Sequence, residues 1–227
     1  MKKYFTLFFI LILISSVKAQ SVGGGFLIGS PQGEFKSNVG RIGFGFQIQG
    51  ALWAPTIERP YTIGLDASYL IYGIKTETMY WGNGYYNKSF DVTRTNSIAS
   101  LHLLFQVNPF FGPVQPYIEG VFGGAYIFTL SEVKSNDNNE SLASSTNLDD
   151  FTWSYGAGAG VLVQIAQDLP EVSALFLDFK VRYTNGTEAK YLTENDIEII
   201  SPTQVNFYPR KSKTDLLTFQ IGIVAYF

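Results

Sequence analysis

The amino-acid sequence contains no cysteine and, among its 227 residues, only one histidine, His102. The absence of cysteine excludes disulfide bonds and a lipid-modified cysteine at a lipoprotein cleavage site. After the first 19 residues there is no run of 18 or more apolar residues, so a membrane-spanning helix is not expected there. Charged residues make up only 15% of the chain and form no basic stripe, which argues against nucleic acid as a partner.

Apolar and aromatic side chains are abundant instead, at 46% and 16% of the sequence, together with 22 glycines. An apolar chain that lacks a helical span favours a β-sheet with one lipid-facing side. The acidic stretch 131–150 lacks the spacing of a calcium loop. The run Gly156–Gly160 has the wrong spacing for a dinucleotide-binding loop. No metal and no cofactor are therefore expected.

The first residues have the order of an export signal. Lys2 and Lys3 are basic, Tyr4–Ile14 is an apolar stretch, and Ala19 fits the small-residue rule for cleavage. Eleven residues are too few to cross a hydrocarbon core of about 30 Å, which requires about 20 in a helix. We expect cleavage between Ala19 and Gln20. This leaves one domain, residues 20–227, with 13 basic and 19 acidic side chains and a net charge of −6.

Alternation with a period of two predicts β-strands along the rest of the chain. In residues 174–185, the odd-numbered side chains from Leu175 to Tyr183 are apolar or aromatic, whereas Asp178, Lys180 and Arg182 lie on the other face. Amphipathic helices are not favoured, because the apolar spacing is two rather than three or four. The predicted strands are residues 22–29, 42–53, 61–74, 93–107, 115–130, 151–165, 174–185 and 215–227.

The connections between these strands alternate in length. Short ones at residues 54–60, 108–114 and 166–173 alternate with long ones at 30–41, 75–92, 131–150 and 186–214. Transmembrane barrels have short periplasmic turns and longer extracellular loops, and an even strand number places both termini in the periplasm. The predicted fold class is therefore all-β, an eight-stranded antiparallel transmembrane β-barrel with an up-and-down meander.

A soluble eight-stranded barrel is the main alternative, with its apolar face inward and its other face in water. In this sequence, the strand faces opposite the apolar ones consist mainly of Gly, Ser, Thr and Gln. These residues fit a crowded interior better than a hydrated surface. Aromatic residues near the ends of the apolar faces are typical of interfacial girdles. They are Trp53, Phe105, Phe110 and Phe227 on the periplasmic side and Tyr126, Phe128, Phe151, Trp153 and Tyr183 on the outer side.

The last eight residues support the membrane interpretation. Gln220, Gly222 and the terminal Phe227, with Ala225 two residues before the end, resemble the carboxy-terminal assembly signal of outer-membrane barrels. Ala225 is small for its position in that signal. Together with the export signal and the strand pattern, the whole mature chain resembles the OmpA/OmpX-like family of small bacterial outer-membrane β-barrel proteins. The resemblance implies a cell outer-membrane location among lipid and lipopolysaccharide. It also implies the barrel-assembly machinery as a partner during insertion, and it transfers no catalytic residue.

Ionisable side chains gather at similar depth on the inward faces of the predicted strands. They are Asp66, His102, Glu119, Asp178, Lys180 and Arg182. The interior of an eight-stranded barrel is only wide enough for side chains to fill it, and buried charges must pair. We therefore expect a salt-bridged plug that closes the lumen. A narrow pore or a proton-responsive core centred on His102 is the alternative, because inward glycines leave room for water.

Surface loops are where recognition usually resides on a rigid barrel. The connection 75–92 carries four aromatic residues, Tyr80, Trp81, Tyr85 and Tyr86, which are favoured contact residues but are equally consistent with an extended girdle. In 186–214, Ile197, Ile199 and Ile200 suggest strands beyond the membrane. Arg210, Lys211 and Lys213 form a basic cluster that could meet lipopolysaccharide phosphates. The stretch 131–150 is predicted to be a solvated tip.

These features predict a non-enzymatic outer-membrane barrel with a structural or surface-interaction role and a surface or envelope protein as partner. The first alternative is a narrow channel or porin for small solutes. The second is a lipid-modifying enzyme, for which Ser100 and His102 would form the catalytic pair. Both side chains are predicted to point into the lumen and lie near the periplasmic end, where lipid cannot reach them.

Overall fold

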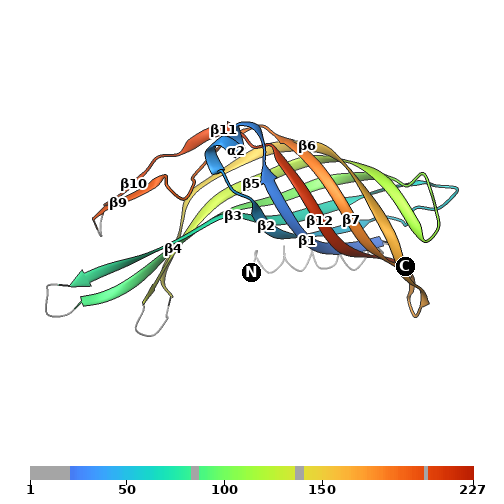
Figure 1. The fold of residues 1–227 in the computed structure, drawn as a ribbon, viewed down its shortest axis with the longest axis horizontal. Helices are drawn as coiled ribbons and strands as arrows, with labels where there is room; N and C mark the ends of the chain where they lie inside the picture. The colour runs from blue at the N-terminus through green and yellow to red at the C-terminus, as the bar shows by residue number, and fades with distance from the viewer. Residues whose placement is uncertain (1–20, 83–86, 136–140, 202–203) are drawn as a thin grey trace, which may run out of the picture.

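The protein forms a closed β-barrel with a long extension at one end (Figure 1). This computed structural model describes residues 21–82, 87–135, 141–201 and 204–227. The predicted export signal with Ala19 and Gln20 lies outside the described residues, and so do Tyr85 and Tyr86. Within the described ranges, no helix is long and apolar enough to cross a membrane.

Eight strands make the barrel wall, and each overlaps one of the predicted segments. They are β1 (Ser21–Pro31), β2 (Gly43–Ala51), β3 (Tyr61–Gly82), β4 (Asn87–Val107), β5 (Val114–Ser135), β6 (Ser141–Leu169), β7 (Val172–Gly186) and β12 (Leu216–Tyr226). Their order around the ring is β1-β12-β7-β6-β5-β4-β3-β2. All neighbours are antiparallel, and Ser21 of the first strand pairs with Tyr226 of the last. The predicted eight-stranded up-and-down barrel is confirmed.

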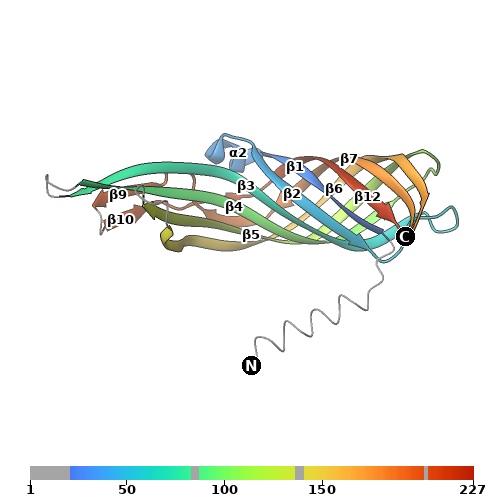
Figure 2. The same ribbon diagram turned by 90° about the horizontal axis from the view of Figure 1, so that it is seen from below.

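The connections β2–β3, β4–β5 and β6–β7 lie at one end, together with the start of β1 and the end of β12. We call this the turn end and the opposite one the extension end. Strands β3 to β6 continue far beyond the ring at the extension end, as Figures 1 and 2 both show. β3 pairs with β4 as far as Gly82 and Asn87, and β5 pairs with β6 as far as Lys134 and Ser141.

The interpretation of residues 75–92 and 131–150 as loops is therefore wrong for most of their length. Polar cross-strand pairs continue the ladder, such as Thr76 with Thr93 and Thr78 with Asp91. Threonine fits the pleated surface of a strand, and such cross-strand pairs stabilise a hairpin that carries polar residues on both faces. A two-sided polar strand has no apolar alternation, which is why the period-2 pattern ended too early.

The connection between β7 and β12 contains four short strands: β8 (Glu188–Tyr191), β9 (Ile197–Ser201), β10 (Gln204–Phe207) and β11 (Arg210–Lys213). β8 pairs with β11 and β9 with β10. The strand predicted from Ile197, Ile199 and Ile200 is confirmed as β9. A short helix that the sequence did not predict, α2 (Gly33–Val39), follows β1 and ends at Gly40 with a left-handed φ of 68°.

The outward face of the wall is a belt of exposed apolar side chains, which we call the apolar belt. It includes Val22, Phe26, Ile28, Phe44, Phe46, Ile48, Ile63, Leu65, Leu101, Leu103, Phe105, Ile118, Phe122, Phe151, Trp153, Tyr155, Phe179, Val181, Tyr183, Phe219, Ile221 and Ile223. Small residues let neighbouring strands approach closely. At Gly45, for example, a Cβ atom would overlap the carbonyl oxygen of Tyr69 on β3.

Candidate functional site

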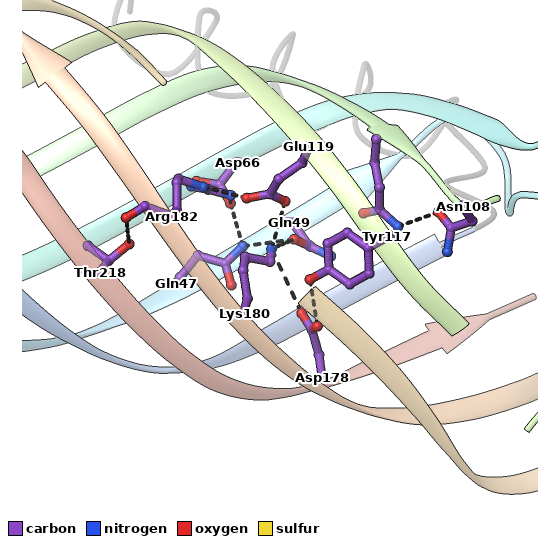
Figure 3. A network of polar contacts seen from close by, with 11 residues as sticks. Gln47, Gln49, Asp66, Asn108, Tyr117, Glu119, Asp178, Lys180, Arg182 and Thr218 are labelled. Carbon is purple, nitrogen blue, oxygen red and sulfur yellow. Dashed lines mark hydrogen bonds and ion pairs between the residues drawn. The ribbon is translucent and has the colours of Figure 1, made fainter. Parts of the chain in front are cut away.

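The inward side chains form three layers, with an apolar layer toward each end of the lumen and an ionic layer between them. The apolar layer at the turn end contains Tyr117, Leu162, Phe176, Val224 and Tyr226, all buried. Buried polar side chains, such as the hydrogen-bonded pair Gln106 and Asn108, also lie toward that end. The layer at the extension end contains Leu27, Leu70, Tyr72, Ile98, Ala125 and Ile127, with residues of a cap described below. Charged and amide side chains occupy the space between them (Figure 3).

Arg182 of β7 is the centre of the ionic layer. Its Nη1 and Nη2 atoms donate to the two carboxylate oxygens of Asp66 at 2.8 and 3.0 Å, and its Nε donates to Glu119 Oε1 at 2.6 Å. A guanidinium that uses its planar fork on one carboxylate and its remaining edge on another is held in a single orientation. Gln47 of β2 completes this group by donating to Asp66 Oδ2 at 2.5 Å.

Lys180 forms the second half of the ionic layer. Its Nζ lies 3.2 Å from Glu119 Oε2 and donates to Gln49 Oε1 at 2.8 Å. It also lies 5.8 Å from the centre of the Tyr117 ring, a cation–π distance. Asp178 lies 3.8 Å from the same nitrogen through Oδ2, and its Oδ1 accepts a hydrogen bond of 2.6 Å from the Tyr117 hydroxyl.

These contacts bridge the full width of the lumen. β7 and β3 are opposite each other in the ring of eight strands, yet Arg182 and Asp66 are in direct hydrogen-bond contact. The side chains of Lys180, Glu119 and Asp66 are fully buried, with 0% exposure, and are closed to solvent from both ends of the lumen. The structure thus places all six predicted lumen residues inside the barrel and joins five of them in one network.

His102 is the sixth; it is opposite Asp66 in the register of β3 and β4, but among the described residues it forms no ion pair. Its Nε2 is 2.5 Å from Ser154 Oγ on β6, and none of the described residues hydrogen bonds its Nδ1. The histidine therefore pairs with Ser154 rather than with Ser100, the serine that its sequence position suggests. An acyl-transfer site would need a carboxylate on Nδ1 and access for a substrate. Both His102 and Ser154 are buried in the lumen.

A cap closes the lumen at the extension end. Phe35 of α2 is fully buried, with edge-on ring contacts to Tyr72 of β3 at 5.6 Å and to Tyr191 of β8 at 5.0 Å. Ala189 and Leu192 are also fully buried. The first connection and the last one thus supply an aromatic stopper from α2 and β8, and β11 pairs with β8. Figure 1 shows α2 and β11 together over the barrel.

Polar contacts lock the two parts of the cap together. Asn38 donates to the Tyr191 hydroxyl at 2.7 Å, and that hydroxyl is 2.8 Å from Ser212. The carboxylate of Glu194 receives both the Arg41 guanidinium and the backbone N–H of Ile74. The cap is therefore fixed to β3 of the wall as well as internally.

The predicted basic cluster does not form in the way that we expected. Arg210 turns inward to Asp196 and Asn38, whereas Lys211 forms an exposed ion pair with Glu188 at 2.7 Å. The hydrogen bond from Lys211 holds the pKa of Glu188 below its usual range. Nearby carboxylates thus compensate two of the three basic side chains, which weakens the case for a phosphate site here.

The remaining predicted residues are placed as follows. Tyr80 and Trp81 belong to β3, with backbones paired to Ser89 and Lys88. Gln220 of the predicted assembly signal points into the lumen, and Gly222 packs so closely that a Cβ atom would press on Gly24.

At the chain end, Ala225 is half-buried and Phe227 is exposed on the outside. These positions match the alternation that was predicted for β12.

Sequence reasoning missed several members of the lumen. Gln47, Gln49, Tyr117 and Ser154 all lie inward by strand parity, but uncharged side chains gave no reason to single them out. Phe35 had no signal at all, since it lies in a connection without periodicity.

Comparison with known proteins gives likenesses of structure only. No protein-family model matches the chain. No curated protein matches it in sequence. Neisserial surface protein A is 12% identical with a TM-score of 0.43, covering 91% of this chain and 96% of that one.

Ail, the attachment invasion locus protein of Yersinia pestis, is 11% identical with a TM-score of 0.37, over 91% and 97% of the two chains. A major outer membrane protein from Thermus thermophilus is 13% identical with a TM-score of 0.40, over 91% and 99%.

Proposed function

We propose that this chain is an integral protein of a bacterial outer membrane with a structural or surface-interaction role. In this proposal a sealed barrel anchors the extension, and the extension makes the contacts. The observation that carries it is the ionic layer, in which zero-exposure side chains join opposite walls of a barrel that is apolar outside.

The apolar belt supports the membrane location. Side chains such as Phe26, with 82% of its surface exposed, form a continuous apolar exterior far larger than soluble proteins leave in water. The short connections would then face the periplasm together with both termini, and the extension would face outward. Lipid would surround the belt, with lipopolysaccharide at the outer rim. The exposed Phe227 would be available to the barrel-assembly machinery.

The extension supports the interaction role. At the β9–β10 hairpin, Phe207 and Tyr208 are exposed by 43% and 54%. Aromatic side chains that protrude in this way are favoured contact residues. Within the described residues, β2 pairs with β3 only as far as Ile71, and Glu194 of the cap accepts the backbone N–H of Ile74. The part of β3 beyond Ile74 therefore presents an edge to which an extended partner segment could add.

Planar-bilayer recording on the purified full chain tests the sealed barrel. We expect no discrete openings for the wild-type protein, because the ionic layer leaves no water path. Openings whose size changes in Lys180→Met or Arg182→Met, but not in Lys211→Met outside the lumen, would show a conducting pore and contradict the proposal.

Fractionation tests the location. We expect the mature protein in the outer-membrane fraction, with gel mobility that changes on heating because a folded barrel resists detergent. A soluble periplasmic protein without this shift would contradict the membrane location.

For the contact role, Phe207→Ala with Tyr208→Ala should weaken a partner's binding to intact cells while surface display stays unchanged.

A further inference from the structure

The buried ionic layer contains an unequal number of acids and bases. Three carboxyl groups, those of Asp66, Glu119 and Asp178, are enclosed with two cations, Lys180 and Arg182. If all five were ionised, one negative charge would be left uncompensated among side chains that are at most 7% exposed. An uncompensated buried charge is strongly unfavourable, and such a group takes up a proton instead.

The geometry shows which carboxyl group is left over. Asp66 accepts two hydrogen bonds from Arg182. Glu119 accepts one from Arg182 on Oε1, and its Oε2 forms an ion pair with Lys180 at 3.2 Å without a hydrogen bond. These contacts use both cations. Asp178 has only a distance of 3.8 Å to Lys180, which is beyond hydrogen-bond range.

The surroundings of Asp178 also favour its neutral form. The Tyr117 hydroxyl donates to Oδ1 at 2.6 Å, and Oδ2 has only the distant Lys180. The aromatic rings of Tyr117, Phe176 and Tyr226 form the apolar layer directly below. Oδ1 thus accepts a hydrogen bond as the carbonyl oxygen of a carboxylic acid does, and Oδ2 is the oxygen that would carry the proton.

We propose that Asp178 is a proton-binding site of the lumen, an un-ionised carboxylic acid at neutral pH with its proton on Oδ2. With this proton bound, two carboxylates balance two cations and the ionic layer has no net charge. Release of the proton would place a bare carboxylate beside Glu119 and above an aromatic layer. The proton is therefore part of the seal, and alkaline conditions should loosen the lumen.

A protonated His102 would also balance the charges, and the geometry argues against it. An imidazolium has two N–H groups to satisfy, and within the described chain only Nε2 has a partner, the Ser154 hydroxyl. The groups facing Asp178 from the packed strands are Tyr117 and Glu119 of β5, Lys180 and Arg182 of β7, and Tyr226 of β12. None of these offers a further cation to Asp178.

The first experiment measures how unfolding depends on pH, with the full chain in lipid vesicles. An unfolded aspartate is ionised above about pH 4, so unfolding of the wild-type protein should release one proton. The unfolding constant should then rise about tenfold per pH unit relative to Asp178→Asn, between about pH 7 and 8.5, where unfolded histidine no longer titrates. Equal slopes for the two proteins would overturn the proposal.

The second experiment uses matched substitutions. Asparagine has nearly the shape of a neutral aspartic acid, so Asp178→Asn should leave the urea midpoint at pH 7 almost unchanged. Asp66→Asn removes a carboxylate that balances Arg182, and its midpoint should fall. A larger loss for Asp178→Asn than for Asp66→Asn would overturn the proposal.

Infrared spectroscopy keeps the test decisive if Asp66→Asn does not fold. The wild-type protein should show the carbonyl band of a buried carboxylic acid, and this band should be absent in Asp178→Asn. It should persist in His102→Asn. A spectrum without that band in the wild-type protein, or its loss in His102→Asn alone, would assign the proton elsewhere and refute the proposal.

Discussion

Replacement of Phe35 by alanine should open the cap and leave the barrel closed. Phe35 is fully buried between Tyr72 and Tyr191, so its removal leaves a cavity lined by two rings. Truncation of a buried phenylalanine costs about 3–5 kcal/mol, including the lost ring contacts. This loss of stability should appear as easier local opening of the cap and not as unfolding of the barrel. The helix α2 belongs to a connection, and no wall strand depends on it for pairing.

Hydrogen exchange of the protein in vesicles measures this effect segment by segment. Amides of α2, β8 and β11 should exchange faster by about two to three and a half orders of magnitude, since about 1.4 kcal/mol corresponds to a factor of ten. Phe207→Ala is the matched control, because that ring is 43% exposed on the β9–β10 hairpin. Unchanged exchange in the cap would refute the stopper role of Phe35, and equal acceleration in β5 or β7 would refute its local character.

Three further outcomes depend on contacts elsewhere. Arg182→Met should lower the free energy of unfolding by about 3–5 kcal/mol, because it strands buried carboxylates, and an unchanged urea midpoint would contradict the network. Gly45→Ala should destabilise the barrel by about 1–3 kcal/mol, because the added Cβ overlaps the backbone of β3. At Gly50 the space is open, so Gly50→Ala should fold with normal heat-modifiable mobility. Equal effects of the two substitutions would contradict the close approach of β2 and β3 at Gly45. Hydrogen bonding to Lys75, together with Arg94, holds the pKa of Glu77 below its usual range, so its stabilisation is present above about pH 4 and is lost as the pH falls further. Exchange in the β3–β4 extension should therefore quicken in acid, and Glu77→Gln should lack most of this acceleration.

The wall and its two faces could be predicted from the sequence because parity alone decides them. Once Leu177, Phe179 and Val181 are assigned outward, Asp178, Lys180 and Arg182 must point inward. The depth of Asp66 and Glu119 followed from counting along strands from the short turns. Period-2 alternation is a strong signal in this chain because an apolar outer face and a filled lumen allow few exceptions.

The partners within the lumen could not be predicted in the same way. Arg182 and Asp66 meet across the ring. The stagger of the strands decides which inward residues face each other across the lumen, and this stagger cannot be read from the sequence. The cap was also beyond prediction, because Phe35 and Tyr191 come from connections far apart in the chain and meet only after the barrel has formed.

The ionic layer and the apolar layers depend on each other. The rings at both ends keep water away, so attraction within the layer is strong and any unpaired charge is costly. To open the lumen, Arg182 would have to leave Asp66 and Glu119 in the same movement, while Lys180 also left Glu119 and Gln49. The paired strands of the extension need none of these contacts. Substitutions there can change what the protein touches without disturbing the seal, and this independence is what a surface-interaction role requires.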